Sequence, residues 1–251
     1  MVKKNITILF SCLYILIYAS NNLSAQEQIK NKLSEAYKDS SCTLIKIFFE
    51  EWENEIKPIS IEEYNLLSDT VKNVYKVFNS FCNYILKEYP YKFKDTPYYL
   101  VQNQIEYTIS NKKHLSKKAK DSTITFTGEI KNFRPFLKLL NKKIIYLSPS
   151  YETALDSFII NESDINPRSK DFFKTPWPGW PRARFLSKMV QIRASLIAFH
   201  YYTLPYISVQ FNNMLNEVII DSNLGNIWMS DKFILSKGVW IYKESLNFLV
   251  E

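Results

Sequence analysis

The spacing of apolar residues changes along the chain, and the first part of the chain has the period of a helix. From Gln28 to Tyr89, apolar residues recur at every third and fourth position, which is the pattern of an α-helix with one buried face. The segment CTLIKIFFEEWENEI carries one wide apolar stripe, and SDTVKNVYKVFNSFCNYIL carries a second that Ser68 is placed to cap. We therefore predict a helical region over residues 28–89.

After Pro90 the period shortens to two. Tyr98–Ile109 and Ser122–Ile130 alternate between apolar and polar positions, and this pattern predicts two paired antiparallel strands. Lys143–Leu147 predicts a short buried strand, and the segment SPSYETALDSFII after it predicts a helix that Ser148 caps.

Residues 161–184 contain four prolines and show no period, which predicts an irregular surface insertion. Beyond it, KMVQIRA predicts a strand and FHYYTLPYISVQF a long one, which Pro205 would confine to a sheet edge or a bulge. LNEVIID, NIWMSDKF and VWIYKESLNFLV predict further strands with turn-sized gaps between them. The predicted fold class is α+β: N-terminal helices packed on a curved, mainly antiparallel sheet that ends in a C-terminal β-meander. We expect one domain over residues 26–251, β-rich from residue 98 onward.

The amino terminus has the three parts of a secretory signal peptide. Lys3 and Lys4 precede an apolar run of 13 residues, and small polar residues lead to a cleavage point that we place after Ala25. A bilayer-spanning helix needs about 20 apolar residues, so we expect export to the periplasm or beyond and no membrane span after cleavage. A cut after Ala19 stays open. Lipidation of Cys12 in LFSC is disfavoured because it would leave an apolar segment at the new terminus.

The charge of the chain changes this interpretation little. The formal net charge of +7 falls to +5 without Lys3 and Lys4, and 27 lysines stand against 5 arginines, a bias typical of an AT-rich genome. Because nucleic-acid recognition favours arginine, we predict no nucleic-acid partner. The lysine-rich segment Lys112–Lys120 is either a basic patch for an acidic surface or, as we favour, a solvated hairpin tip.

Few residues are candidates for chemistry. Cys42 and Cys82 either form a disulfide or are buried thiols, and with only His114 and His200 to help them no metal site is predicted. Four scattered glycines form no phosphate-binding loop, so no cofactor is expected. His200 is either a general base beside a pocket or, as we favour, a partly buried histidine with one hydrogen bond.

The segment TPWPGWPRAR is the most distinctive stretch of the sequence. Trp177 and Trp180 on a proline-stiffened loop can stack against sugar rings, with Arg182 or Arg184 reaching hydroxyl or carboxylate groups. The alternative, which we favour, is that both indoles pack on the core and hold the irregular segment in place. The candidate ligand-binding residues are Trp177, Trp180, Arg182, Arg184 and His200.

A hydrolase would need two carboxylates that face one another across a substrate. Five acidic residues fall in predicted strands, without a motif that selects a pair among them: Glu106, Glu129, Glu217, Asp221 and Glu244.

The order of elements and the ending VWIYKESL resemble the nuclear-transport-factor-like superfamily, in which a curved sheet wraps helices into a cone with a pocket at its open end. VQNQIEYTI, NFRPF, IIYLSPSYETAL and LPYISVQFN resemble segments of uncharacterised secreted proteins of Gram-negative bacteria. The resemblances imply an exported protein of a single family and transfer no active-site residue.

The function expected from the sequence is therefore broad. We expect a non-catalytic module that binds a glycan or protein partner in the cell envelope, because a signal peptide and an aromatic-rich sheet occur without a catalytic motif. The alternatives are a secreted glycan hydrolase and a protein inhibitor or immunity factor that uses an exposed sheet edge.

Overall fold

A computed structural model of the protein describes residues 26–93, 95–116, 124–137, 142–160, 180–194, 199–201, 203–223 and 227–250. The chain divides into two compact units, and each is described by itself. Unit 1 comprises Met1–Phe49 and Ser148–Leu186, and unit 2 comprises Glu50–Leu147 and Ser187–Glu251. The expected single domain stays a prediction, and the predicted signal peptide lies outside the described residues.

Unit 1 is helical in its described part. Residues 26–38 form a helix, followed by α2 (Cys42–Glu55), α5 (Pro149–Ile159) and α6 (Trp180–Leu186). The last turns of α2, from Glu50 onward, belong to unit 2. The ring of Tyr37 meets the ring edges of Phe158 and Phe185 at centroid distances of 6.0 and 5.5 Å. The apolar stripes read from the sequence supply this packing, since Ile45, Phe49 and Phe158 are fully buried.

The prediction of an irregular insertion over residues 161–184 is wrong for its last residues. Trp180–Leu186 form α6, and Ala183, Phe185 and Leu186 are buried. Pro181 is compatible with this helix because it stands in the first turn, where a backbone N–H has no helical partner. Residues 161–179 lie outside the described residues.

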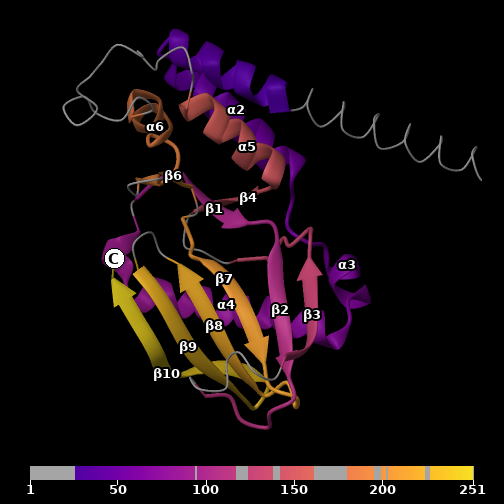
Figure 1. The fold of residues 1–251 in the computed structure, drawn as a ribbon. Helices are drawn as coiled ribbons and strands as arrows, with labels where there is room; N and C mark the ends of the chain where they lie inside the picture. The colour runs from indigo at the N-terminus through magenta and orange to yellow at the C-terminus, as the bar shows by residue number, and fades with distance from the viewer. Residues whose placement is uncertain are drawn as a thin grey trace, which may run out of the picture. The chain divides into compact units, whose positions relative to one another are not determined.

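Unit 2 is built on a six-stranded sheet (Figure 1). The strand order is β10–β9–β8–β7–β2–β3, and every neighbouring pair is antiparallel except β2 and β7. The strands are β2 (Ile105–Ser110), β3 (Ile124–Ile130), β7 (Tyr206–Phe211), β8 (Glu217–Asn223), β9 (Ile227–Ser236) and β10 (Val239–Val250). The predicted α+β class and the C-terminal antiparallel meander are confirmed.

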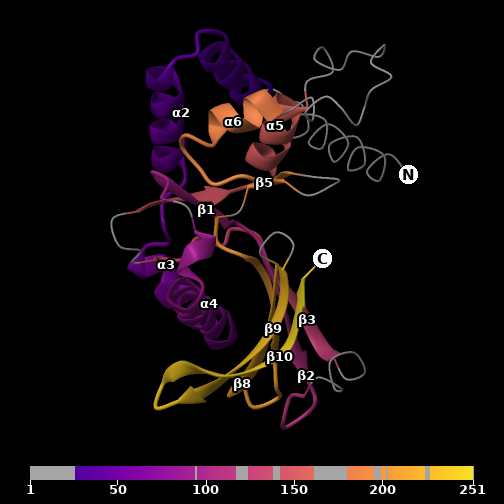
Figure 2. The same ribbon diagram turned by 90° about the vertical axis from the view of Figure 1, so that its left-hand side faces the viewer.

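Helix α4 (Asp69–Glu88) lies against the concave face of this sheet (Figure 2). Ser68 caps its start as predicted, accepting a hydrogen bond from the backbone N–H of Val71. Phe78 and Phe81 on the helix and Phe233 on β9 are 0 to 1% exposed in one core cluster. Because each such side chain stabilises a fold by about 1.5–3 kcal/mol when buried, the packing of α4 on the sheet contributes several kcal/mol to the stability of unit 2.

The predicted continuous strand from Tyr98 to Ile109 is wrong. It breaks into β1 (Tyr98–Gln102), which pairs in parallel with β4 (Lys143–Leu147), and β2 in the larger sheet. Gln102 explains the break: its side-chain amide accepts from the backbone N–H of Ile207 at 2.6 Å and donates to the Ile207 carbonyl at 3.1 Å. The side chain thus occupies both ladder positions that a neighbouring backbone would fill.

The predicted long strand from Phe199 to Phe211 is also divided. Its parts are β6 (Phe199–His200), which pairs with β5 (Arg193–Ala194), and β7, which starts directly after Pro205. Thr203 explains the interruption, because its N–H and hydroxyl bond to the carbonyl and N–H of Leu100. The predicted strand KMVQIRA is reduced to β5 and a single bridge at Val190.

Cys42 and Cys82 form no disulfide within the described residues. Cys42 is exposed, whereas Cys82 lies buried on the core face of α4, and burial raises the pKa of its thiol. Of the two open interpretations, the buried thiol therefore holds for Cys82. In the described part of the chain, no helix combines the length and the apolar character needed to cross a membrane.

Candidate functional site

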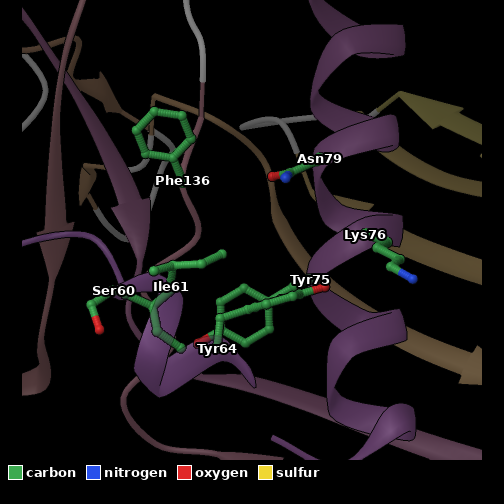
Figure 3. Close-up of a pocket in the computed structure, with 8 residues that line it drawn as sticks. Ser60, Ile61, Tyr64, Tyr75, Lys76, Asn79 and Phe136 are labelled. Carbon is green, nitrogen blue, oxygen red and sulfur yellow. The ribbon is translucent and has the colours of Figure 1, made fainter. Parts of the chain in front are cut away.

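Unit 2 contains a pocket with a volume of about 350 Å³ between the segment that enters α3 (Ile61–Leu66), helix α4 and Phe136. Figure 3 shows Tyr75 and Asn79 pointing from α4 toward this segment, with Phe136 opposite Asn79. The described residues that line the pocket are Ile59, Ser60, Ile61, Tyr64, Tyr75, Lys76, Asn79 and Phe136.

One wall of the pocket is fixed by a capping box at the start of α3. The Ser60 hydroxyl accepts from the Glu63 N–H at 3.1 Å, and Glu63 Oε2 accepts from the Ser60 N–H at 2.9 Å. These two bonds satisfy backbone donors that the helix itself leaves open. The bond from the Ser60 backbone and a further one from Arg134 hold the pKa of Glu63 below its usual value, so Glu63 stays ionised.

Arg134 ties this wall to the rest of the pocket. Its guanidinium donates to Glu63 Oε1 at 3.0 Å and to the carbonyl of Lys57 at 3.2 Å. Its backbone carbonyl accepts from the Ile59 N–H at 2.9 Å. Its backbone N–H donates to the Tyr75 hydroxyl. These four contacts of Arg134 define the spacing between the residues that enter α3, helix α4 and the residues that lead to Phe136.

The inner surface of the pocket is aromatic. Tyr64 and Tyr75 meet edge to face with centroids 5.8 Å apart, and Tyr75 packs on the fully buried Phe133 at 4.6 Å. Phe133 in turn packs edge to face against Phe78 at 5.0 Å. Burial raises the pKa of Tyr64 and of Tyr75, so both phenols stay uncharged.

Asn79 supplies an unused acceptor at the pocket. Its Oδ1 is shielded from solvent and has no hydrogen-bond partner among the described residues. A shielded carbonyl without a partner costs a fold about 1–3 kcal/mol. Asn83, on the same helix, is exposed, so its amide can bond to water and carries no such cost. A ligand that donates a hydrogen bond to Asn79 Oδ1 would remove the cost at Asn79.

The mouth of the pocket is apolar and open. Ile61 is 65% exposed and Phe136 is 60% exposed, while Lys76 extends to the other side of α4 (Figure 3). Among the described lining residues there is no carboxylate, histidine or thiol. The arrangement can therefore hold an apolar molecule and orient it by one hydrogen bond, but it offers no acid–base pair.

The residues singled out from the sequence lie elsewhere. Trp180 is 45% exposed at the start of α6, Arg184 is exposed, and Trp177 lies outside the described residues. Arg182 is buried in unit 1, where its guanidinium donates to the Phe158 carbonyl at 3.1 Å and lies over the rings of Tyr37 and Phe158. These contacts account for the Arg182 charge without a ligand. Only the backbone of His200 is described, paired with Arg193 in the β5–β6 ladder.

Two of the five strand carboxylates share a second hollow. Glu106 on β2 and Asp221 on β8 line a cavity of about 190 Å³ with Thr108, Ser208 and Gln210 among its other residues. The strand register places Glu129 directly opposite Glu106. Glu244 is exposed on β10, opposite Lys232.

The fifth carboxylate, Glu217, is held in a group that we call the Glu217 clamp, formed by His114, Leu115, Glu217 and Lys232. Glu217 Oε1 lies 2.7 Å from His114 Nδ1, and Oε2 accepts from the Leu115 N–H and from Lys232 Nζ, both at 2.9 Å. Burial alone would raise the pKa of Glu217, but these partners lower it to about 2. Because both of its oxygens are bonded to these partners, Glu217 holds residues 114–115 on the sheet and is poorly placed to act as a catalytic acid or base.

The clamp also concerns the lysine-rich segment. Lys232 Nζ donates to the Leu115 carbonyl at 2.9 Å, and Asn212 Nδ2 donates to the Lys113 carbonyl at 2.6 Å. The first part of the predicted hairpin tip is therefore bound to β8 and β9. Residues 117–120 lie outside the described residues.

Asp231 lies within β9, on the opposite face of the sheet from the Glu217 clamp and in the core beside α4. It is 2% exposed, and its Oδ2 has no hydrogen-bond partner in the described part of the chain. Burial raises its pKa to about 6, although a hydrogen bond with Ser245 acts in the other direction. No described group of three or more histidine, cysteine or acidic residues is placed to hold a metal ion.

Comparison of the chain with protein-family models, with curated proteins and with solved structures found no match. The resemblances drawn from sequence segments and element order therefore stay predictions.

Sequence reasoning missed the pocket because its residues are dispersed. Ser60 and Glu63 have the spacing of a capping box, and this signal would have located α3. Asn79 interrupts the apolar face of α4 one turn after Tyr75, which is a second readable signal. Nothing in the sequence connects either of them to Arg134 or Phe136.

Proposed function

We propose that the protein is an exported, non-catalytic module that binds a small, largely apolar ligand in the pocket between α3, α4 and Phe136. The observation that carries the proposal is the pocket itself: about 350 Å³, with aromatic walls and an exposed apolar mouth. Concave, mainly apolar pockets with a few placed polar groups are the usual form of small-molecule sites. Export is supported by the sequence signal at residues 1–25.

A fluorescent apolar probe tests this proposal on residues 26–251. We expect the rings of anilinonaphthalene sulfonate to bind saturably at one site while its sulfonate stays in solvent at the open mouth. Ile61→Trp should weaken binding about tenfold or more because the indole fills the mouth. Leu66→Trp is the matched control, since Leu66 is 88% exposed on the same helix and does not line the pocket. Equal binding by the parent and both variants would place the probe elsewhere and contradict the proposal.

One observation favours a second candidate function, a hydrolase acting on envelope glycan. Glu106 and Asp221 line the same hollow, and paired carboxylates are what glycosidic cleavage requires. Hydrolysis of soluble glycan fragments by the parent, abolished in both Glu106→Gln and Asp221→Asn but retained in Glu244→Gln, would establish this activity in place of simple binding. Absence of turnover in the parent would remove it.

A further inference from the structure

We propose that Asn79 selects the ligand of this pocket, which we infer to be a flat, uncharged aromatic molecule that donates one hydrogen bond from an N–H or O–H group to Asn79 Oδ1. The inference rests on the proposed function, because it names the ligand class of the same pocket.

Asn79 carries a hydrogen-bond acceptor that no described residue satisfies. The residue lines the pocket, and its Oδ1 is shielded from bulk water by the surrounding protein atoms. Two neighbouring hydroxyls each already accept a hydrogen bond: the Ser60 hydroxyl from the Glu63 N–H, and the Tyr75 hydroxyl from the Arg134 N–H. A ligand that brings a donor therefore completes a bond that the protein leaves open, whereas one that brings an acceptor meets an unpaired carbonyl.

The walls define the body of the ligand. Tyr64, Tyr75 and Phe136 offer ring faces and edges, and Ile59 and Ile61 offer aliphatic surface. Flat aromatic molecules match such walls because offset and edge-to-face ring contacts are favourable. A volume of about 350 Å³ lies at the small end of ligand pockets, which suits one or two fused rings.

The charges around the pocket argue for an uncharged ligand. Both tyrosine hydroxyls stay protonated because burial raises their pKa. Glu63 spends its carboxylate on Ser60 and Arg134, and the Lys76 amine extends away from the space between Tyr64 and Phe136 (Figure 3). Neither a cationic nor an anionic group would find an opposite charge inside.

A pair of probes of nearly the same shape tests the role of Asn79. Indole donates a hydrogen bond through its N–H, whereas benzofuran carries an oxygen at that position and donates none. Displacement of anilinonaphthalene sulfonate, or calorimetry, gives the affinity of each probe for the parent, for Asn79→Leu and for the control Asn83→Leu. Asn83 lies on the same helix, is exposed and does not line the pocket.

We expect the parent and Asn83→Leu to bind indole about fivefold or more tightly than benzofuran, as one net hydrogen bond requires. Asn79→Leu should bind the two with a ratio near one. In the unmodified protein, indole and not benzofuran should shift the carbon resonance of the Asn79 side-chain carbonyl, which keeps the test independent of how the variant folds.

The outcomes separate this inference from the proposed function. If anilinonaphthalene sulfonate binds at the pocket but indole and benzofuran displace it equally, or benzofuran binds more tightly, the selection by Asn79 is wrong and the binding function stands. If the fluorescent probe does not bind the parent in a way that Ile61→Trp weakens, the proposed function itself is wrong.

Discussion

Two carboxylates on neighbouring strands of one sheet have pKa values shifted in opposite directions. Glu217 in the Glu217 clamp has three donors within 2.9 Å and a pKa of about 2, whereas Asp231 keeps one oxygen without a described partner and has a pKa of about 6. Burial acts in the same direction on both groups. The comparison shows that hydrogen-bond partners decide the direction of the pKa shift, and that unit 2 contains both a carboxylate with partners on each oxygen and a carboxylate that lacks a described partner on one.

Removing the carboxylate of the Glu217 clamp should have the largest effect on the stability of the protein. Glu217→Ala leaves Lys232, which is 12% exposed, without its anion, and a buried charge that loses its partner destabilises a fold by about 3–5 kcal/mol. Urea denaturation at pH 7 measures this loss. Glu244→Ala is the control, because Glu244 lies opposite Lys232 on β10 but is exposed, so its removal should change stability by about 0.5 kcal/mol or less. Equal losses in the two variants would contradict the clamp.

Replacing the carboxyl of Asp231 should have the next largest effect on stability, in the opposite direction. A carboxyl whose pKa rises from 3.8 to about 6 on folding costs about 3 kcal/mol at neutral pH. Asp231→Asn should therefore stabilise the protein by up to this amount at pH 7, measured as the free energy of unfolding.

The pH dependence provides the check on Asp231. Because its folded pKa is raised, the stability it contributes is present below about pH 4 and is lost as the pH rises through 6, so the advantage of Asp231→Asn should vanish near pH 4. Glu217 has the reverse sign: its contribution is present above pH 4.5 and is lost as the pH falls toward 2. An advantage of Asp231→Asn that is the same at pH 4 and pH 7 would argue against a buried ionised carboxylate.

Asn79 in the pocket is another polar group without a described partner, and replacing it should change stability by a smaller amount. Asn79→Leu removes a shielded carbonyl without a described partner and should raise stability by about 1–2 kcal/mol, while abolishing the preference for indole over benzofuran. Binding sites commonly hold such destabilising groups. Thermal unfolding of Asn79→Leu beside Asn83→Leu measures the effect, and a lower stability of Asn79→Leu would show that the amide is already satisfied.

The capping box should give the smallest effect. Ser60→Ala removes the acceptor for the Glu63 N–H and should destabilise α3 by about 1 kcal/mol. Amide hydrogen exchange in α3 should speed up while exchange in the core of α4 stays unchanged. If both helices respond equally, α3 is not a locally stabilised element.

The parts of the fold that were predictable are those that local pattern determines. The apolar stripes that predict α2, α4 and α5 repeat with the helical period, and short turn sequences separate β7, β8, β9 and β10. The structure has these elements close to the predicted bounds. The break between β1 and β2 was not predictable, because it depends on Gln102 bonding to Ile207, 105 positions away. The helix α6 was missed because its proline and its two arginines are typical of a loop, and the burial of Phe185 and Leu186 is not visible in the sequence.

The site was less predictable than the fold for the same reason. The sequence favoured Trp177 and Trp180 as ligand-binding candidates because they stand in a proline-rich segment without a period. The pocket is instead assembled by Arg134, which bonds to residues more than 70 positions away in the sequence. Among the strand carboxylates, sequence could not tell that Glu217 is committed to Lys232. In each case the deciding contact joins distant residues, which periodicity does not encode.

Gln102 belongs to two hydrogen-bonded sheets at once. Its backbone is part of the β1–β4 pair, and its side-chain amide bonds to Ile207 on β7 of the six-stranded sheet. The Ile207 N–H at the start of β7 is protected by this side chain and not by a strand, so releasing it requires motion in the segment that also carries β1. Together with the hydrogen bonds between Thr203 and Leu100, the Gln102 side chain joins β1 to the segment that enters β7. We therefore expect a fluctuation that loosens the β1–β4 pair to loosen the start of β7 as well.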